Sequence, residues 1–203
     1  IGFIFAGKLE RKGTKFILFD SSARQTTWQS ECLKKWNHYF FIQKTSNMSV
    51  KTGEKAPVFT LFSSDKEQIA LENYRGKNVV LLFFPMAFTG VCTTELCTMR
   101  DDISNYNNLN AQILAASVDS PFALDKFKKE QQLNFPLLSD FNKEVSRMYG
   151  ALYEEFVMGL RGVSKRSAFV IDKEGVVRYA EVLESAGDLP DFGAIKQTLS
   201  QLN

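Results

Sequence analysis

The stretch PMAFTGVCTTELC, from Pro85 to Cys97, places a cysteine at the point where a hydrophobic strand would pass into a helix. The six residues before it, 79–84 (VVLLFF), are all apolar and rich in strand formers. This is the pattern of a strand that is buried on both faces. The sequence therefore predicts a central strand that ends at Pro85.

Apolar residues after the strand recur with helical spacing, which predicts a helix from the Cys92 region to about residue 109. The residues of this stripe are Cys92, Leu96, Met99, Ile103 and Tyr106. Cys92 is thus expected in the first turn of the helix, facing inward. Unpaired backbone N–H groups and the positive end of the helix dipole favour a thiolate at such a position. The position is suited to nucleophilic chemistry.

The composition is that of an ordinary globular protein, with 203 residues, a net charge of +2, 44% hydrophobic and 24% charged residues. No apolar run approaches 18 residues, so no membrane-spanning helix is expected. Three cysteines argue against a secreted disulfide framework, and a single histidine without a Cys/His cluster argues against a zinc site. We therefore expect a reducing compartment, namely the cytoplasm, and no metal or cofactor.

Residues 1–47 differ from the remainder in charge, with eight basic and three acidic residues against seventeen and twenty in 48–203. Their apolar clusters show no sustained periodicity and no secretory signal. The segment resembles either an organelle targeting leader or an upstream extension with translation starting at Met48, and we favour the second interpretation. Cys32 and His38 are assigned no role. We expect 48–203 to form one domain, whose mildly acidic balance gives no reason to expect nucleic-acid binding.

From Met48 onward, strand and helix patterns alternate, which predicts an α/β fold with a central mixed sheet flanked by helices. The other expected elements are strands at 58–61, 68–70 and 111–117, a helix at 120–131 capped by Ser120, a helix capped by Asp140 that ends near Gly150, an antiparallel hairpin at 167–171 and 176–182, and a helix at 191–202.

Three residues of the opening stretch could act together. Cys92 supplies a nucleophile, Thr89 supplies a hydroxyl in the same turn, and Pro85 stiffens the strand exit and can shield a thiolate from water. Each residue also has a simpler explanation. Thr89 could be a helix N-cap, Pro85 could merely end the strand, and Cys92 could be a small buried hydrophobe.

The motif Pro85-x-x-x-Thr89-x-x-Cys92 is similar to the active-site motif of the peroxiredoxins, the alkyl hydroperoxide reductase/thiol-specific antioxidant family. FPLLSDFNKEVSRMYG (135–150) resembles the segment after their second core strand, and Arg166 in RSAFVID (166–172) falls where they carry an active-site arginine. The resemblance spans about 50–202 and is greatest to the single-domain bacterial branch. FFPMAFTGVC looks like the one-cysteine AhpE type, whereas Cys92-x4-Cys97 looks like the BCP or PrxQ type.

The resemblance implies a thioredoxin-like fold and a thiol-dependent peroxidase that reduces hydrogen peroxide and organic hydroperoxides through a cysteine sulfenic acid. Cys92 would be the peroxidatic cysteine, Thr89 and Arg166 would hold the peroxide, and Pro85 would be the shield. Cys97 would resolve the sulfenic acid as an intramolecular disulfide, which thioredoxin or a similar dithiol reduces. The one-cysteine resemblance implies instead that an external thiol recycles the enzyme. The family allows a monomer or a homodimer.

Glu95 and Arg100 occur where this family often carries a polar pair that braces the site, although both could equally be surface charges. Two other classes of protein remain open. A thioredoxin-like thiol-disulfide exchanger would require Cys-x-x-Cys, which this chain lacks. A non-catalytic thioredoxin-fold binding module would not require the set formed by Pro85, Thr89, Cys92 and Arg166.

Overall fold

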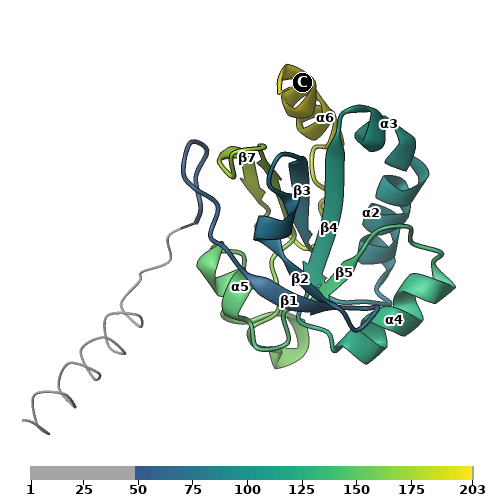
Figure 1. Cartoon of the computed structure of the whole chain (residues 1–203). Coiled ribbons are helices and arrows are strands. Elements are labelled where there is room, and N and C mark those ends of the chain that lie inside the picture. Colours follow the sequence, from purple (N-terminus) through teal and green to yellow (C-terminus); the bar gives the residue numbers. More distant parts are fainter. Residues whose placement is uncertain (1–48, 203) are drawn as a thin grey trace, which may run out of the picture. The chain divides into compact units, whose positions relative to one another are not determined.

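The computed structural model describes residues 49–202, which form a sheet of seven strands with helices on both faces (Figure 1). The strands are β1 (Thr60–Ser63), β2 (Gln68–Ala70), β3 (Asn78–Phe83), β4 (Ala111–Ser117), β5 (Leu137–Ser139), β6 (Ser167–Ile171) and β7 (Val177–Val182). The helices are α2 (Gly90–Asp101), α3 (Ile103–Asn108), α4 (Pro121–Glu130), α5 (Glu144–Met148) and α6 (Phe192–Gln201), with short 3-10 turns η1 (Leu71–Tyr74) and η2 (Val157–Gly159). The expectations for residues 1–47, including Cys32 and His38, lie outside the described residues.

Strand β3 lies in the interior of the sheet, as its sequence predicts. The strand order is β2-β1-β5-β4-β3-β6-β7, and all six residues of β3 are buried. It pairs in parallel with β4 and antiparallel with β6, so the sheet is mixed. The parallel β3–β4 pair and the antiparallel β6–β7 hairpin are both confirmed.

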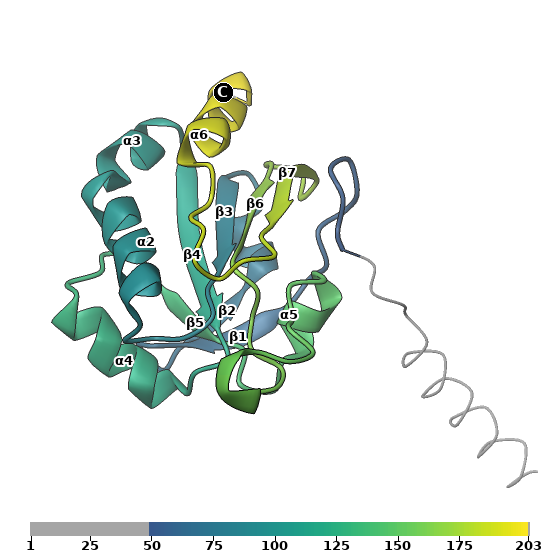
Figure 2. The same cartoon turned by 180° about the vertical axis from the view of Figure 1, so that it is seen from behind.

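Alternate residues of β3 point to two separate hydrophobic clusters, because side chains of a strand alternate between its faces. Val80 and Leu82 pack in the cluster that contains the buried residues of α2, α4 and α6. Leu81 and Phe83 pack in the cluster formed with α5, η1 and the segment that begins at Val50. Figure 2 shows α2 and α4 together beside one face of the sheet and α5 beside the other. Cys92 belongs to the first cluster.

The single helix expected from Cys92 to about residue 109 is wrong, because the structure has α2 and α3 with a break at Asp102. Asp102 accepts hydrogen bonds from Lys196 Nζ at 2.9 Å and from the side chain of Asn105. Asp and Asn favour such local hydrogen bonds over helix continuation, and residues 101–110 are rich in both. Tyr106 is nevertheless fully buried on the predicted face.

Local capping signals mostly act as expected. Ser120 accepts a hydrogen bond from the Ala123 N–H and caps α4. Asp140 accepts the backbone N–H groups of Val145 and Ser146, but it does so from upstream of α5, whose N-cap position is occupied by Lys143. The strand expected at 58–61 begins instead at residue 60. Among the described helices, none is both long enough and apolar enough to span a membrane.

Candidate active site

Cys92 lies in the first turn of α2, at the carboxyl end of β3. Strand β3 ends at Phe83, a six-residue loop (84–89) follows, and α2 begins at Gly90. The side chain of Cys92 is almost completely buried, with 1% of its surface exposed. Burial among apolar residues would suit a structural cysteine as well as a reactive one. The polar neighbours of its sulfur distinguish a reactive cysteine from a structural one.

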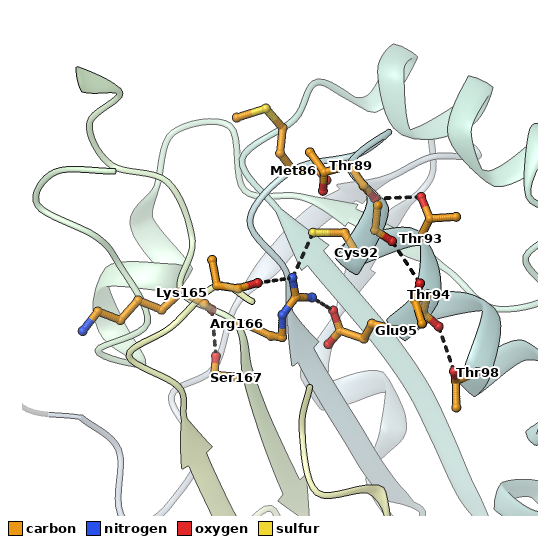
Figure 3. A network of polar contacts seen from close by, with 12 residues as sticks. Met86, Thr89, Cys92, Thr93, Thr94, Glu95, Thr98, Lys165, Arg166 and Ser167 are labelled. Atoms are coloured by element: carbon orange, nitrogen blue, oxygen red, sulfur yellow. Dashed lines mark hydrogen bonds and ion pairs between the residues drawn. The ribbon is translucent and has the colours of Figure 1, made fainter. Parts of the chain in front are cut away.

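Arg166 is the polar neighbour that contacts the sulfur (Figure 3). It immediately precedes β6, whose first residue, Ser167, pairs with Phe83 at the end of β3. This antiparallel register brings Arg166 to the same end of the sheet as Cys92. Its Nη2 donates a hydrogen bond to Cys92 Sγ at 3.3 Å and another to the carbonyl of Ala186 at 3.0 Å. The guanidinium is 1% exposed, so its charge acts on the sulfur with little screening by water.

Glu95 is the acidic partner of Arg166, and both side chains are buried. Nη1 of Arg166 donates a hydrogen bond to Glu95 Oε2. Burial raises the pKa of Glu95 to about 7, because the loss of water outweighs the attraction of Arg166 for the carboxylate. Burial acts to lower the pKa of Arg166, but the attraction of Glu95 and Cys92 outweighs it and raises the pKa. One guanidinium therefore links the thiol to a buried carboxyl.

Thr89 and Pro85 lie on the loop between β3 and α2. Pro85 is buried, whereas Thr89 is exposed. Thr89 occupies the N-cap position of α2, but its side chain makes no capping hydrogen bond. Its hydroxyl instead donates to the carbonyl of Met86 at 2.9 Å, so the simple capping explanation does not hold. In the view of Figure 3, Thr89 and Arg166 lie on opposite sides of the Cys92 sulfur.

Cys97 lies on the same helix as Cys92, and both are free thiols in this structure. Helix α2 is continuous between them. Cys97 is partly buried, and its Sγ lies 3.8 Å from Oε1 of Gln131, at the end of α4. The structure therefore assembles Cys92 and Arg166 by direct contact, places Thr89 and Pro85 on the adjoining loop, and holds Cys97 farther along α2.

Glu95 and Arg100, which were expected as a pair that braces the site, do not contact each other among the hydrogen bonds and ion pairs of the described residues. Arg100 makes an ion pair with its neighbour Asp101 at 2.8 Å and donates to the carbonyl of Gln131. Glu95 turns inward to Arg166 instead, so its interpretation as a surface charge is wrong. A signal for this was present in the sequence, because Glu95 follows Cys92 by three residues and such residues share a helix face.

Comparison with known proteins agrees with this architecture. The model of the AhpC/TSA family matches residues 52–180. Alkyl hydroperoxide reductase E of Mycobacterium tuberculosis is 38% identical over 145 residues, which cover 70% of this chain and 91% of that protein. The bovine mitochondrial thioredoxin-dependent peroxide reductase is 33% identical over 171 residues, covering 79% of this chain and 63% of that protein. The crystal structure of peroxidoxin BcpB from M. tuberculosis matches with a TM-score of 0.68 and 28% identity over 76% of this chain and 99% of that one.

The family match, the likeness to a solved peroxidoxin structure and the cysteine in the first turn of α2 together place this chain in the peroxiredoxin class of thiol-dependent peroxidases. This chain belongs to the AhpC/TSA family of that class.

Proposed function

We propose that this protein reduces hydrogen peroxide and organic hydroperoxides, with Cys92 as the peroxidatic cysteine. The observation that carries the proposal is the hydrogen bond from the buried guanidinium of Arg166 to Cys92 Sγ at 3.3 Å. A positive charge at this distance, together with the N-terminal end of α2, stabilises a thiolate, which is the nucleophilic form of cysteine. The family match, with relatives named for hydroperoxide reduction, supports the same activity.

In the proposed first step, the thiolate of Cys92 attacks the terminal oxygen of a hydroperoxide. An S–O bond forms and the O–O bond breaks, so that the sulfur is oxidised by two electrons to a sulfenic acid. The other oxygen leaves as hydroxide or alkoxide and takes up a proton to become water or an alcohol. Negative charge therefore moves from the sulfur to the leaving oxygen, and donors directed at both atoms lower the barrier most.

The neighbouring residues have distinct proposed roles in this step. Arg166 can donate to the sulfur and to a peroxide oxygen at once, because its planar guanidinium offers several N–H groups. Because the proton of the Thr89 hydroxyl is directed at the Met86 carbonyl, its oxygen lone pairs remain available to accept a hydrogen bond from the peroxide. Pro85, buried within the loop, offers no N–H and limits the access of water to the sulfur.

Replacement of Cys92 tests the nucleophile directly. Cys92→Ser is expected to abolish consumption of hydrogen peroxide and of tert-butyl hydroperoxide with dithiothreitol as reductant. Cys97→Ser is the matched control, and it should still react once with peroxide to give a sulfenic acid on Cys92. Catalytic peroxide consumption by Cys92→Ser would show that another group is the nucleophile.

For the second step, we propose that Cys97 attacks the sulfenic acid to form a Cys92–Cys97 disulfide with release of water. Residues five apart on an intact helix are separated by about 7.5 Å along the axis and point about 140° apart, which exceeds the reach of a disulfide. The first turns of α2 must therefore unwind after oxidation. Thr93 and Thr94, which lie between the cysteines, are poor helix formers and make this local unwinding less costly.

Mass spectrometry after one equivalent of peroxide distinguishes the two recycling routes. Loss of two hydrogens and a linked peptide that contains Cys92 and Cys97 are expected. A lasting sulfenic acid on Cys92 beside a free Cys97 would favour recycling by an external thiol, as in the one-cysteine alternative.

Thioredoxin or a similar dithiol is the proposed reductant of this disulfide, and the bovine relative is named for thioredoxin. Turnover with peroxide should be supported by thioredoxin and its reductase. A thiol-disulfide exchanger would instead reduce insulin disulfides without peroxide, and a binding module would do neither. We place this chemistry in a reducing compartment, the cytoplasm, with the protein acting as a monomer or a homodimer.

A further inference from the structure

The position of Thr89 depends on the loop between β3 and α2. Within this loop, the Met86 carbonyl accepts the Thr89 hydroxyl, and Phe88 has a φ of +64°. Left-handed backbone is unusual for a bulky residue, and it persists where surrounding contacts hold it. Arg166 and Cys92 lie outside this loop, just before β6 and on α2. The contacts that fix the loop therefore act on Thr89 and Pro85 separately from Cys92 and Arg166.

Asp119 supplies a contact that joins this loop to the body of the protein. The backbone N–H of Ala87, in the middle of the loop, donates to Asp119 Oδ2 at 2.8 Å. Asp119 lies just after β4, the strand parallel to β3, so both loops emerge from the same end of the sheet (Figure 1). A hydrogen bond from a backbone N–H to a carboxylate is among the stronger hydrogen bonds in proteins.

Two serine hydroxyls from adjacent strands hold Asp119 in place. Ser117 Oγ donates to the same carboxylate oxygen at 2.8 Å and accepts the Asp119 N–H at 3.2 Å. Ser139 Oγ donates to the Asp119 carbonyl at 2.6 Å. Ser117 and Ser139 are both buried, and they face each other across the β4–β5 pair. The carboxylate is thus fixed to the rigid sheet before it meets the loop.

We propose that Asp119 is a positioning residue of the peroxidase reaction, which holds the 84–89 loop so that Thr89 can orient the peroxide against Cys92. The inference rests on the proposed function. Asp119 is expected to affect the rate of the reaction with peroxide but not the formation of the Cys92 thiolate. The thiolate depends on Arg166 and on the start of α2, which make no contact with Asp119 among the hydrogen bonds of the described residues.

This separation gives the proposal a test that a general loss of structure would not pass. Two rates are measured for the reduced protein: the rate of a single turnover with hydrogen peroxide, and the rate of Cys92 alkylation by iodoacetamide across a range of pH. Iodoacetamide reacts with the thiolate but needs no peroxide site. Asp119→Ala should slow the peroxide reaction by about 10- to 100-fold, as expected for a small misplacement of reacting groups. Its alkylation rate and pH profile should stay within about twofold.

Two further variants serve as rescue and control. Asp119→Asn keeps an oxygen that can accept the Ala87 N–H, so it should recover most of the peroxide rate. Asp125→Ala, which removes an aspartate of α4 paired with Lys129, should leave both rates unchanged. If Asp119→Ala does not fold, Ser117→Ala decides the question, because it removes a hydrogen bond to the same oxygen and should slow the peroxide reaction at least about threefold.

The outcomes separate this inference from the proposed function. Slow reaction of the unaltered protein with peroxide, or peroxide turnover by Cys92→Ser, would overturn the proposed function. If the unaltered protein reacts rapidly with peroxide and Asp119→Ala reacts equally rapidly, only the role of Asp119 is overturned. If Asp119→Ala is unfolded, an equally rapid reaction of Ser117→Ala has the same meaning. Equal losses in the peroxide and alkylation rates would also overturn it, because they would indicate general disruption of the site.

Discussion

Glu95 and Arg166 form a buried hydrogen-bonded pair that becomes an ion pair when Glu95 ionises, with 0% and 1% of their side-chain surfaces exposed. Two buried charges lose their hydration, so such a pair is retained only where its geometry and its other hydrogen bonds compensate. Arg166 has a second partner in Cys92 Sγ. The pair thus fixes the guanidinium beside the sulfur, and the ionisation of Glu95 is tied to the energetics of the site.

The raised pKa of Glu95 predicts a distinctive pH dependence of stability. The folded protein keeps a proton on Glu95 up to about pH 7, whereas the unfolded chain releases it near the ordinary value of 4.5. The stabilisation is therefore fully present below pH 4.5 and is lost as the pH rises through 7. Relative to Glu95→Gln, the free energy of unfolding should fall by on the order of 1 to 3 kcal/mol across this window.

Urea unfolding between pH 4 and 8 measures this difference. A Cys92→Ser background removes the titration of the thiol from both proteins. Glu184→Gln, which removes an exposed carboxylate paired with Lys165, shows what the loss of a surface charge does by itself. Parallel stability profiles for the Glu95→Gln variant and its parent would contradict the prediction.

Arg166→Lys should slow the reaction of Cys92 with peroxide by about 100- to 1000-fold, since a lysine ammonium lacks the planar fork that reaches two partners. The measurement is the second-order rate constant for sulfenic acid formation. Lys165→Ala is the control, because this neighbouring lysine points to Glu184 and the ring of Tyr153. A rate for Arg166→Lys within about threefold of the parent would show that charge alone is sufficient.

At the scale of elements, α2 carries Cys92 in its first turn, and the proposed Cys92–Cys97 disulfide would require this end of the helix to unwind. Three threonine hydroxyls along it donate to the carbonyl four residues earlier: Thr93 to Thr89, Thr94 to Gly90 and Thr98 to Thr94. Such bonds slightly destabilise and bend helices. Toward its far end, Arg100 ties α2 to the carbonyl of Gln131. These contacts favour unwinding at the end that carries Cys92.

Thr94 and Thr98 provide a matched pair for testing where α2 unwinds. Both are exposed and make the same type of hydrogen bond, but only Thr94 lies between the two cysteines. Thr94→Ala should slow disulfide formation by about two- to threefold, because alanine stabilises the helix that must open. Thr98→Ala should have little effect.

The rate is followed from the linked Cys92–Cys97 peptide after one equivalent of peroxide. Equal slowing by the two variants would indicate that all of α2 unwinds. No slowing by Thr94→Ala would argue against a local opening as the limiting step.

At the scale of the whole molecule, the described residues contain every residue proposed for the site. Near their beginning, Val50 is buried, and the Gly53 N–H donates to the carbonyl of Val177 at 2.8 Å. Gly150 has a φ of +67°, and a Cβ placed on it would lie 2.5 Å from the Cα of Ser49. The packing of the segment that follows Met48 is thus part of the folded unit.

A protein that starts at Met48 should therefore fold and react with peroxide as the full chain does. A protein that starts at Glu54 should lose about 2 to 3 kcal/mol of stability, because it lacks buried Val50 and the hydrogen bond to Val177. Thermal unfolding and the peroxide rate of both proteins test these expectations. If the protein that starts at Met48 is much less stable or less active than the full chain, residues 1–47 have a structural role.

Local patterns in the sequence were sufficient to predict most elements of the described chain. The apolar run of β3, the spacing of Cys92 and Leu96, and the cap at Ser120 each depend on residues within a few positions of one another. The same reasoning extended the helix past Asp102, because it followed the apolar stripe to Tyr106 and gave no weight to the Asp- and Asn-rich residues 101–110. The hydrogen bond from Lys196, 94 residues away, does not appear in any local pattern.

The candidate active site likewise combines residues that the local sequence predicted with contacts that only the tertiary structure forms. The motif and the resemblance proposed Cys92, Thr89, Pro85 and Arg166 as site residues, but they did not show the contacts that hold Arg166 and the 84–89 loop in place. Glu95 meets Arg166 across 71 positions, and Ala87 meets Asp119 across 32. These contacts arise because β3 pairs with both β4 and β6, which brings the ends of all three strands together. Sequence periodicity reports which face a residue takes within its own element, whereas only the pairing of elements decides which residues it meets there.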